Sequence, residues 1–232
     1  MLRDLLQSSA VWGVLLTLAA FALGTWINKK TGKAVFNPLL LGTIFVILFL
    51  RIGGLDYAGY KASAAPVSYL LLPATVSLGV PLYEKWDLLK QHALAILAGI
   101  LTGVLASLGS ILVLALVLDL DMVQYATLLP KSVTTAISMD VSAALGGIAA
   151  LTGAIVILTG ILGNLLAEPV CRLFHITDPM AKGIGIGTAA HAIGTSRALE
   201  MGETEGAMSG LAIAVAGVLT ALLCPVFAAF LA

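Results

Sequence analysis

One short stretch of the chain gathers side chains that can hold an anion: Pro130, Lys131, Ser132, Thr134 and Thr135. The flanking sequence is apolar, and a charged group at bilayer depth costs at least about 2.5–3.5 kcal/mol. Such a group is retained mainly where it lines a cavity or meets a partner. A helix that starts near Met122 would carry Lys131 roughly 13 Å along its axis, close to the bilayer midplane.

Pro130 predicts a break in this helix, because proline cannot make the regular helical hydrogen bond. A helix restarting after the break would direct free N–H groups and the positive end of its dipole into the gap. Together with the lysine and the hydroxyls, these groups predict a site for a small carboxylate. The alternative is that Lys131 extends its ammonium group to the membrane surface.

His191 is the second candidate, in a segment rich in glycine and alanine at about 183–200. Thr188, His191 and Thr195 follow the i, i+3, i+7 spacing that puts side chains on one helical face. A histidine can donate to a carboxylate and titrates near neutral pH, so His191 is also a candidate proton carrier. The alternative is a structural histidine that bonds a neighbouring helix.

Other polar groups give weaker signals. Asp140 is a candidate counter-ion or proton carrier, or it marks where its segment reaches the interface. Arg197 and Glu200 are three residues apart and are expected to pair at the membrane edge. The first half offers helix-breaking prolines with polar neighbours, as a pseudo-symmetric binding site would need: Pro38, Pro73, Asn37, Thr75 and Ser77.

No spacing in the chain is typical of catalysis or of cofactor binding. The sequence has no Ser-His-Asp pattern, no metal-ligand cluster and no phosphate-binding glycine loop, so we expect no catalytic residues, no metal and no cofactor. The formal net charge is zero, which gives no reason to expect nucleic acid as a partner. Cys171 and Cys224 are interpreted as ordinary buried thiols, with a disulfide between them left open.

The composition is that of a multi-pass protein of the cell membrane. It is 60% hydrophobic and 10% charged, with a mean hydropathy of +1.08. Several runs without Asp, Glu, Lys or Arg are long enough to cross a hydrocarbon core of about 30 Å as helices: residues 5–28, 62–83, 93–118, 141–167 and 206–232. Adding the shorter run 34–50 and the segments at about 122–143 and 183–200 gives eight predicted membrane segments. The first run does not have the form of a cleaved signal peptide.

Two segments are predicted to be broken or re-entrant, the one after Met122 and the one at about 64–83. The latter holds Pro66, Pro73 and Pro81, which one straight helix does not accommodate. Interrupted segments in both parts of the chain favour a transporter of two pseudo-symmetric halves, about 1–120 and 121–232, within one domain. The lysine-rich connector 28–33 predicts a cytoplasmic loop, which puts both termini outside if every segment spans.

The chain resembles the LrgB/CidB family over nearly all of its length. The matching stretches are Asn37-Pro38-Leu39-Leu40, Pro73-Ala74-Thr75-Val76, Pro130-Lys131-Ser132-Val133-Thr134-Thr135, Gly146-Gly147, and 187–195 followed by Arg197-Ala198-Leu199-Glu200. Ala136 and Ala149 stand where that family usually has prolines. The resemblance implies a holin/antiholin-like regulator of murein hydrolase activity that acts with a small LrgA/CidA-type membrane partner. It also implies carboxylate transport, because the plant plastidial glycolate/glycerate translocator is similar.

Of these two functions, the intramembrane polar cluster favours transport. We therefore expect a secondary transporter of small 2-hydroxy or 2-oxo monocarboxylates such as glycolate, glycerate, lactate or pyruvate. It would work by alternating access, with a coupled proton or sodium ion, as a homodimer in the lipid bilayer. The competing hypothesis is the antiholin-like regulator of cell lysis.

Overall fold

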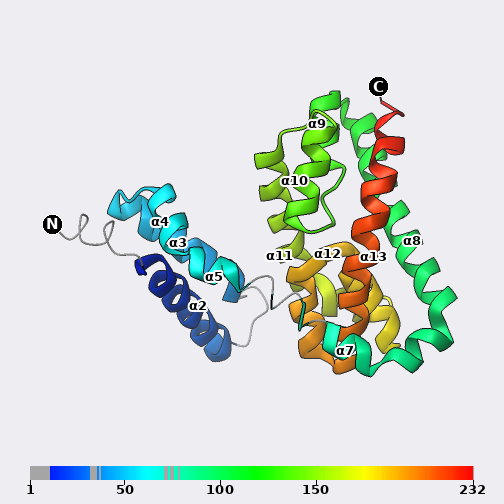
Figure 1. Ribbon diagram of the computed structural model, residues 1–232, viewed down its shortest axis with the longest axis horizontal. Helices are drawn as coiled ribbons and strands as arrows, with labels where there is room; N and C mark the ends of the chain where they lie inside the picture. Colours follow the sequence, from blue (N-terminus) through cyan, green and yellow to red (C-terminus); the bar gives the residue numbers. More distant parts are fainter. Residues whose placement is uncertain are drawn as a thin grey trace. The chain divides into compact units, whose positions relative to one another are not determined.

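The computed structural model describes residues 11–31, 36, 38–70, 73, 76–77 and 79–231. The chain divides into two compact units, residues 1–77 and 78–232 (Figure 1). All regular elements within the described residues are helices, which confirms the all-α class. The single-domain organisation with halves near residue 120 stays a prediction.

The first unit contains four described helices: α2 (Trp12–Thr31), α3 (Pro38–Gly53), α4 (Tyr57–Ser63) and α5 (Ala65–Tyr69). α2 packs along α3, and polar contacts attach α4 to the start of α2. The Gly13 N–H donates to Ser63 Oγ at 3.1 Å, and the hydroxyls of Thr17 and Tyr60 share a hydrogen bond of 2.8 Å. These contacts satisfy polar groups that an apolar surrounding would otherwise leave without partners.

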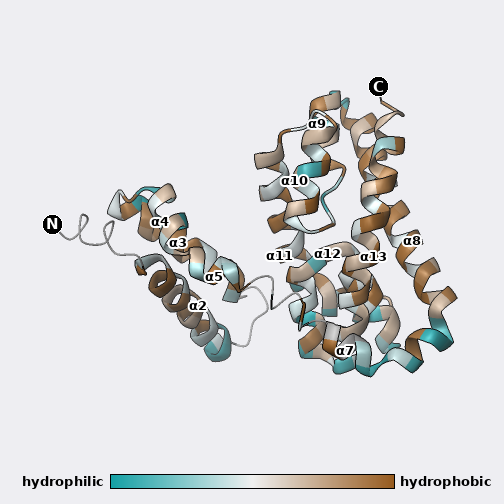
Figure 2. Ribbon diagram, in the orientation of Figure 1, coloured by the Kyte–Doolittle hydropathy of each residue, from teal (hydrophilic) through white to brown (hydrophobic). Residues whose placement is uncertain are grey.

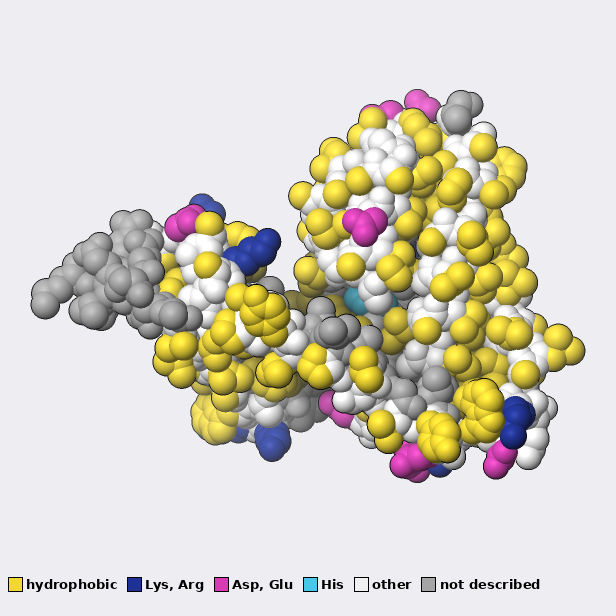
Figure 3. Space-filling view, viewed as in Figure 1, with side chains coloured by type: hydrophobic (Ala, Val, Ile, Leu, Met, Phe, Trp, Pro, Cys, Tyr) yellow, Lys and Arg dark blue, Asp and Glu magenta, His cyan; other side chains and the backbone are white. Residues whose placement is uncertain are grey.

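Three helices of the second unit are long and apolar enough to cross a membrane, counted among the described residues: α8 (Trp86–Leu118), α11 (Ala149–Leu173) and α13 (Glu203–Ala228). They span about 50, 38 and 39 Å at 1.5 Å per residue, enough for a hydrocarbon core of about 30 Å. Hydrophobic residues dominate α8 and α13 in Figure 2, and on the face in Figure 3 charged side chains gather mainly at the ends of this unit. Together with the apolar α3, these helices confirm a membrane protein.

α8 and α13 form the core of the second unit. Buried α8 side chains recur every three or four residues from Ile96 to Ala115 and meet Ala212 and Ala216 of α13. Both helices start at the same end, where Lys85 Nζ lies 3.1 Å from Glu203 Oε2. α7 (Gly79–Glu84) also packs on α13 near this start. We call this end of the second unit the Trp86 end and the opposite one the Leu118 end.

The chain between α8 and α11 folds back on itself as a helical hairpin. α9 (Met122–Leu128) and α10 (Thr135–Ala144) are joined by residues 129–134, and we call residues 122–144 hairpin 1. Thr152 Oγ1 donates to both Thr127 O (2.9 Å) and Ser142 Oγ (2.7 Å), so the two arms lie side by side. Tyr125 Oη donates to Phe227 O at 3.0 Å, which puts the open end of hairpin 1 at the Leu118 end.

α12 (Pro179–Met201) is a second hairpin, hairpin 2, although the spacing of Thr188, His191 and Thr195 predicted that they share one helical face. Its backbone leaves helical values at Ala190 (φ −133°, ψ 15°) and His191 (φ 42°, ψ −144°). A Cβ built on Gly194 would lie 3.1 Å from Ile186 Cγ2, whereas eight residues of straight helix would separate them by about 12 Å. Both ends of hairpin 2 therefore lie at the Trp86 end, between the end of α11 and the start of α13.

The second unit thus combines three membrane-length helices with two hairpins that enter from opposite ends. Of the two segments expected to be interrupted, the one after Met122 is hairpin 1. The stretch 64–83 contains the short helices α5 and α7, and part of it lies outside the described residues. Eight membrane segments and a repeat of two halves stay predictions.

Cysteine labelling from the two sides of the membrane tests the reversal in α12. With Cys171 and Cys224 replaced by alanine, we expect Thr177→Cys and Glu203→Cys to react with a membrane-impermeant maleimide from the same side. Gln124→Cys, at the Leu118 end, should react from the other side. Labelling of positions 177 and 203 from opposite sides would mean that α12 crosses the membrane.

Candidate functional site

Lys131 lies in the connection of hairpin 1, residues 129–134, which we call tip 1. Tip 1 is largely buried, including Leu129, Ser132 and Val133. Ser138 Oγ from α10 donates to Pro130 O at 2.6 Å and to Val133 O at 3.2 Å. These two bonds satisfy carbonyl groups that have no helical partner, and they hold the tip inside the protein.

The ammonium group of Lys131 is surrounded by hydroxyls. Its Nζ donates to Ser132 Oγ at 3.0 Å and to Ser107 Oγ of α8 at 3.4 Å, and the two hydroxyls share a bond of 2.8 Å. No ion pair within the described part of the chain includes Lys131. A half-buried ammonium group with neutral partners is suited to bind a carboxylate through charge-assisted hydrogen bonds.

His191 forms the reversal of hairpin 2 together with Ala190, and we call these two residues tip 2. A φ of 42° is uncommon for a residue with a side chain and requires surrounding contacts to hold it. His191 is 2% exposed, and its Nε2 lies 2.9 Å from Val156 O of α11. Its ring packs on Gly160, where a Cβ would lie 2.6 Å from Cε1, so α11 has no side chain at the point of contact.

The three predicted residues of α12 do not share one helical face, because the reversal turns them to different neighbours. His191 faces α11, as described. Thr195 Oγ1 donates to His191 O at 3.0 Å and shares a 2.7 Å bond with Ser209 Oγ of α13. Thr188 is 4% exposed and packs against Gly103 of α8, and its hydroxyl has no hydrogen-bond partner among the described residues.

Tip 1 and the first arm of hairpin 2 meet the same face of α8. Thr188, three residues before His191, touches Gly103, and Ser132 of tip 1 touches Ser107. Gly103 and Ser107 are one turn apart on one helical face, a separation of about 6 Å along the axis. The Lys131 cluster and the unpartnered Thr188 hydroxyl therefore lie close together, near the middle of the three long helices.

Several predicted residues lie away from this cluster. Asp140 is exposed on α10, Thr134 precedes the first turn of α10, and the Thr135 side chain packs toward α11. Pro38 begins α3 in the first unit, where Ser77 Oγ also donates to Pro73 O at 2.8 Å. Asn37 and Thr75 lie outside the described residues.

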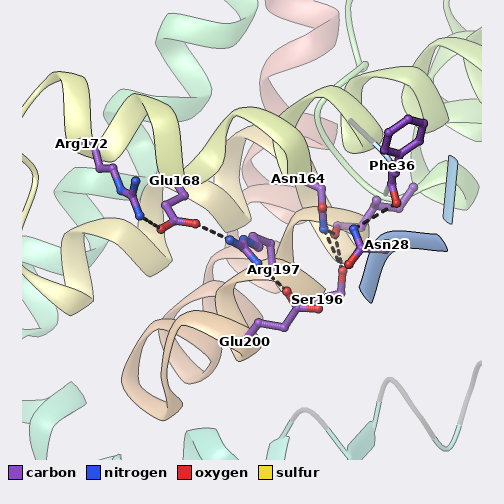
Figure 4. A network of polar contacts seen from close by, with 9 residues as sticks. Asn28, Phe36, Asn164, Glu168, Arg172, Ser196, Arg197 and Glu200 are labelled. Carbon is purple, nitrogen blue, oxygen red and sulfur yellow. Dashed lines mark hydrogen bonds and ion pairs between the residues drawn. The ribbon is translucent and has the colours of Figure 1, made fainter. Parts of the chain in front are cut away.

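Arg197 and Glu200 pair at the Trp86 end through a bond of 2.7 Å. Arg197 also bonds Glu168 of α11, which in turn pairs with Arg172, so the four side chains form one network (Figure 4). In the same view Asn164 donates to Ser196 Oγ at 3.0 Å, and it also donates to Ile193 O at 2.9 Å. The network and Asn164 tie the second arm of hairpin 2 to α11.

Sequence reasoning missed Ser107, because it lies in an apolar helix without a neighbouring polar cluster. The spacing of Gly99, Gly103 and Ser107 could have revealed it, because small residues at every fourth position indicate a close helix contact in membranes. Asn164 and Glu168 were missed for a similar reason, because each stands alone in an apolar segment.

Replacing Thr188 by valine removes the hydroxyl but keeps the shape of the side chain, so the variant tests the hydroxyl separately from its packing. We expect Thr188→Val to leave the thermal unfolding midpoint unchanged or to raise it, because a buried hydroxyl without a partner costs about 1–3 kcal/mol. Thr152→Val should lower the midpoint, because it removes the bonds that join the arms of hairpin 1 to α11. A clear destabilisation by Thr188→Val would show that the hydroxyl already has a partner.

Comparisons with known proteins agree with the membrane architecture. Residues 17–230 match the model of the LrgB-like family. The chain is 37% identical over 220 residues to the antiholin-like protein LrgB of Bacillus subtilis strain 168, covering 94% of this chain and 95% of the relative. It is 34% identical over 221 residues to the antiholin-like protein LrgB of Bacillus mycoides strain KBAB4, with 95% and 96% coverage. No solved structure matches the chain. The chain belongs to the LrgB-like family.

Proposed function

We propose that this chain is an antiholin-like protein of the cell membrane that regulates murein hydrolase activity and lysis with a small LrgA/CidA-type partner. The observation that carries this proposal is the similarity to relatives named antiholin-like LrgB along almost their whole length. The match covers 95% and 96% of these relatives, so the similarity does not rest on a small part of them. The membrane-length helices of the second unit are consistent with action inside the bilayer. From the sequence we expected transport first and this function second, but the names of the relatives favour regulation of lysis.

A lysis assay tests the antiholin-like function. In a bacterium deleted for its own LrgB-like gene, expression of this chain with its small partner should delay lysis and lower the murein hydrolase activity seen on a zymogram. Expression of the partner alone is the control. Unchanged lysis and unchanged hydrolase activity, with the chain present in the membrane, would contradict the proposal.

Transport of small monocarboxylates is the second candidate, and one observation favours it. Two interrupted elements enter from opposite ends and place Lys131 and Thr188 against neighbouring turns of α8. Interrupted helices that meet near the midplane form the substrate sites of many secondary transporters. A lesion-forming or purely regulatory protein has no evident need for a lysine held among hydroxyls at this depth.

In this mechanism, the Lys131 ammonium group binds the carboxylate of a 2-hydroxy or 2-oxo acid. Ser107 and Ser132 donate to the same carboxylate, and Thr188 bonds the hydroxyl or carbonyl group of the substrate. His191 carries a coupled proton, or a sodium ion is coupled instead. Movement of a hairpin away from α8 exposes the site to one side at a time, within a homodimer, and no covalent chemistry takes place.

Uptake into proteoliposomes tests transport. Labelled glycolate or pyruvate should enter in a saturable manner, and Lys131→Met should reduce uptake at least about tenfold, because the loss of a buried charged hydrogen-bond donor weakens binding by roughly 1.5–3 kcal/mol. Lys90→Met, at an exposed lysine paired with Asp87, is the matched control. Equal uptake by the wild type and Lys131→Met would contradict the site. Leakage of a trapped dye without saturation would indicate a pore.

A further inference from the structure

A cavity lies at the Trp86 end, away from the tips. It has a volume of about 470 Å³, within the range of roughly 300–1,000 Å³ common for small-molecule sites. It is bounded by the end of α11, both ends of hairpin 2 and the first turn of α13. Its ionisable lining residues are Glu168, Arg172, His175, Lys182, Arg197, Glu200 and Glu205, with Cys171 beside them.

Four of these charges neutralise one another. Glu168 bonds both Arg172 and Arg197, and Arg197 also bonds Glu200, so two cations face two anions (Figure 4). The network spans α11 and the second arm of hairpin 2, and it forms one wall of the cavity. Its groups already have partners of opposite charge and therefore offer a ligand little additional charge.

Two opposite charges in the same cavity have no such partner. Glu205 is 8% exposed, and no side chain in the described part of the chain lies within ion-pair distance of its carboxylate. Its position in the first turn of α13 supplies only a partial positive charge from the helix dipole. Lys182, in the first turn of hairpin 2, is half-buried and also lacks an ion-pair partner among the described residues.

The burial of the unpaired Glu205 carboxylate indicates what kind of ligand the cavity would bind. A buried carboxylate without a cationic partner is costly, and Lys182 lies on the wall of the same cavity but does not approach within 4.0 Å. The two groups lie on different elements, Lys182 on hairpin 2 and Glu205 on α13. A ligand that carries both charges can complement them together, whereas a simple anion or cation would leave one of them uncompensated.

We propose that this cavity binds a small zwitterion, such as a free amino acid, with its carboxylate on Lys182 and its ammonium group on Glu205. The site is distinct from the Lys131 cluster and does not rest on either proposed function. It joins the base of hairpin 2 to α11 and α13, so the bound ligand contacts all three elements.

Calorimetric titration of the purified full-length chain tests the proposal with three probes of similar size. Alanine carries both charges, lactate only the carboxylate, and ethanolamine only the ammonium group. We expect alanine to bind, and both Lys182→Met and Glu205→Gln to weaken its binding at least tenfold. The matched controls Lys90→Met and Glu84→Gln, at exposed positions outside the cavity, should leave the affinity unchanged.

The probes also separate this cavity from the tips. Lactate binding that is lost in Lys131→Met but kept in Lys182→Met belongs to the Lys131 cluster and leaves this proposal intact. The proposal is overturned if alanine does not bind, if Lys182→Met binds alanine as the wild type does, or if lactate binds through Lys182 as tightly as alanine. Should Glu205→Gln fail to fold, Lys182→Met with rescue by Lys182→Arg still decides the outcome.

Discussion

Backbone groups released by a helix break must find partners within the protein, because hydrocarbon offers none. The second unit meets this requirement at both tips with short polar side chains. The Ser138 hydroxyl donates to the carbonyl oxygens of Pro130 and Val133, and the Thr195 hydroxyl donates to that of His191. These bonds lower the cost of placing the two tips between the long helices.

Small residues on the long helices provide the space for the tips. The side chain of Thr188 packs against Gly103 of α8, and the ring of His191 packs against Gly160 of α11. Since a methyl group at either position would overlap its neighbour, these two glycines fix how deeply hairpin 2 enters. The same contacts bring Thr188 within one turn of Ser107, and therefore near Lys131.

The two proposed functions make different demands on this arrangement. An antiholin-like role requires helices that lie in the membrane, and the long apolar helices are suited to that. Carrier activity requires a polar site that opens to alternate sides, for which two hairpins against one helix are suited. The functions are compatible, because a regulator of lysis can also respond to the solute that it binds.

The membrane class, the family and the interruption near Pro130 could be predicted from the sequence alone. These follow from local signals: charge-free runs, a recognisable motif, and a residue that cannot donate a backbone hydrogen bond. Three features became visible only in the folded chain: α12 turns back at His191, Ser107 bonds Lys131, and the Thr188 hydroxyl has no partner among the described residues. A segment rich in glycine and alanine is compatible with a straight or a reversed path. The contact of His191 with Val156 of α11, which is 35 residues away in the chain, selects the reversed path, and that path brings Ile186 against Gly194.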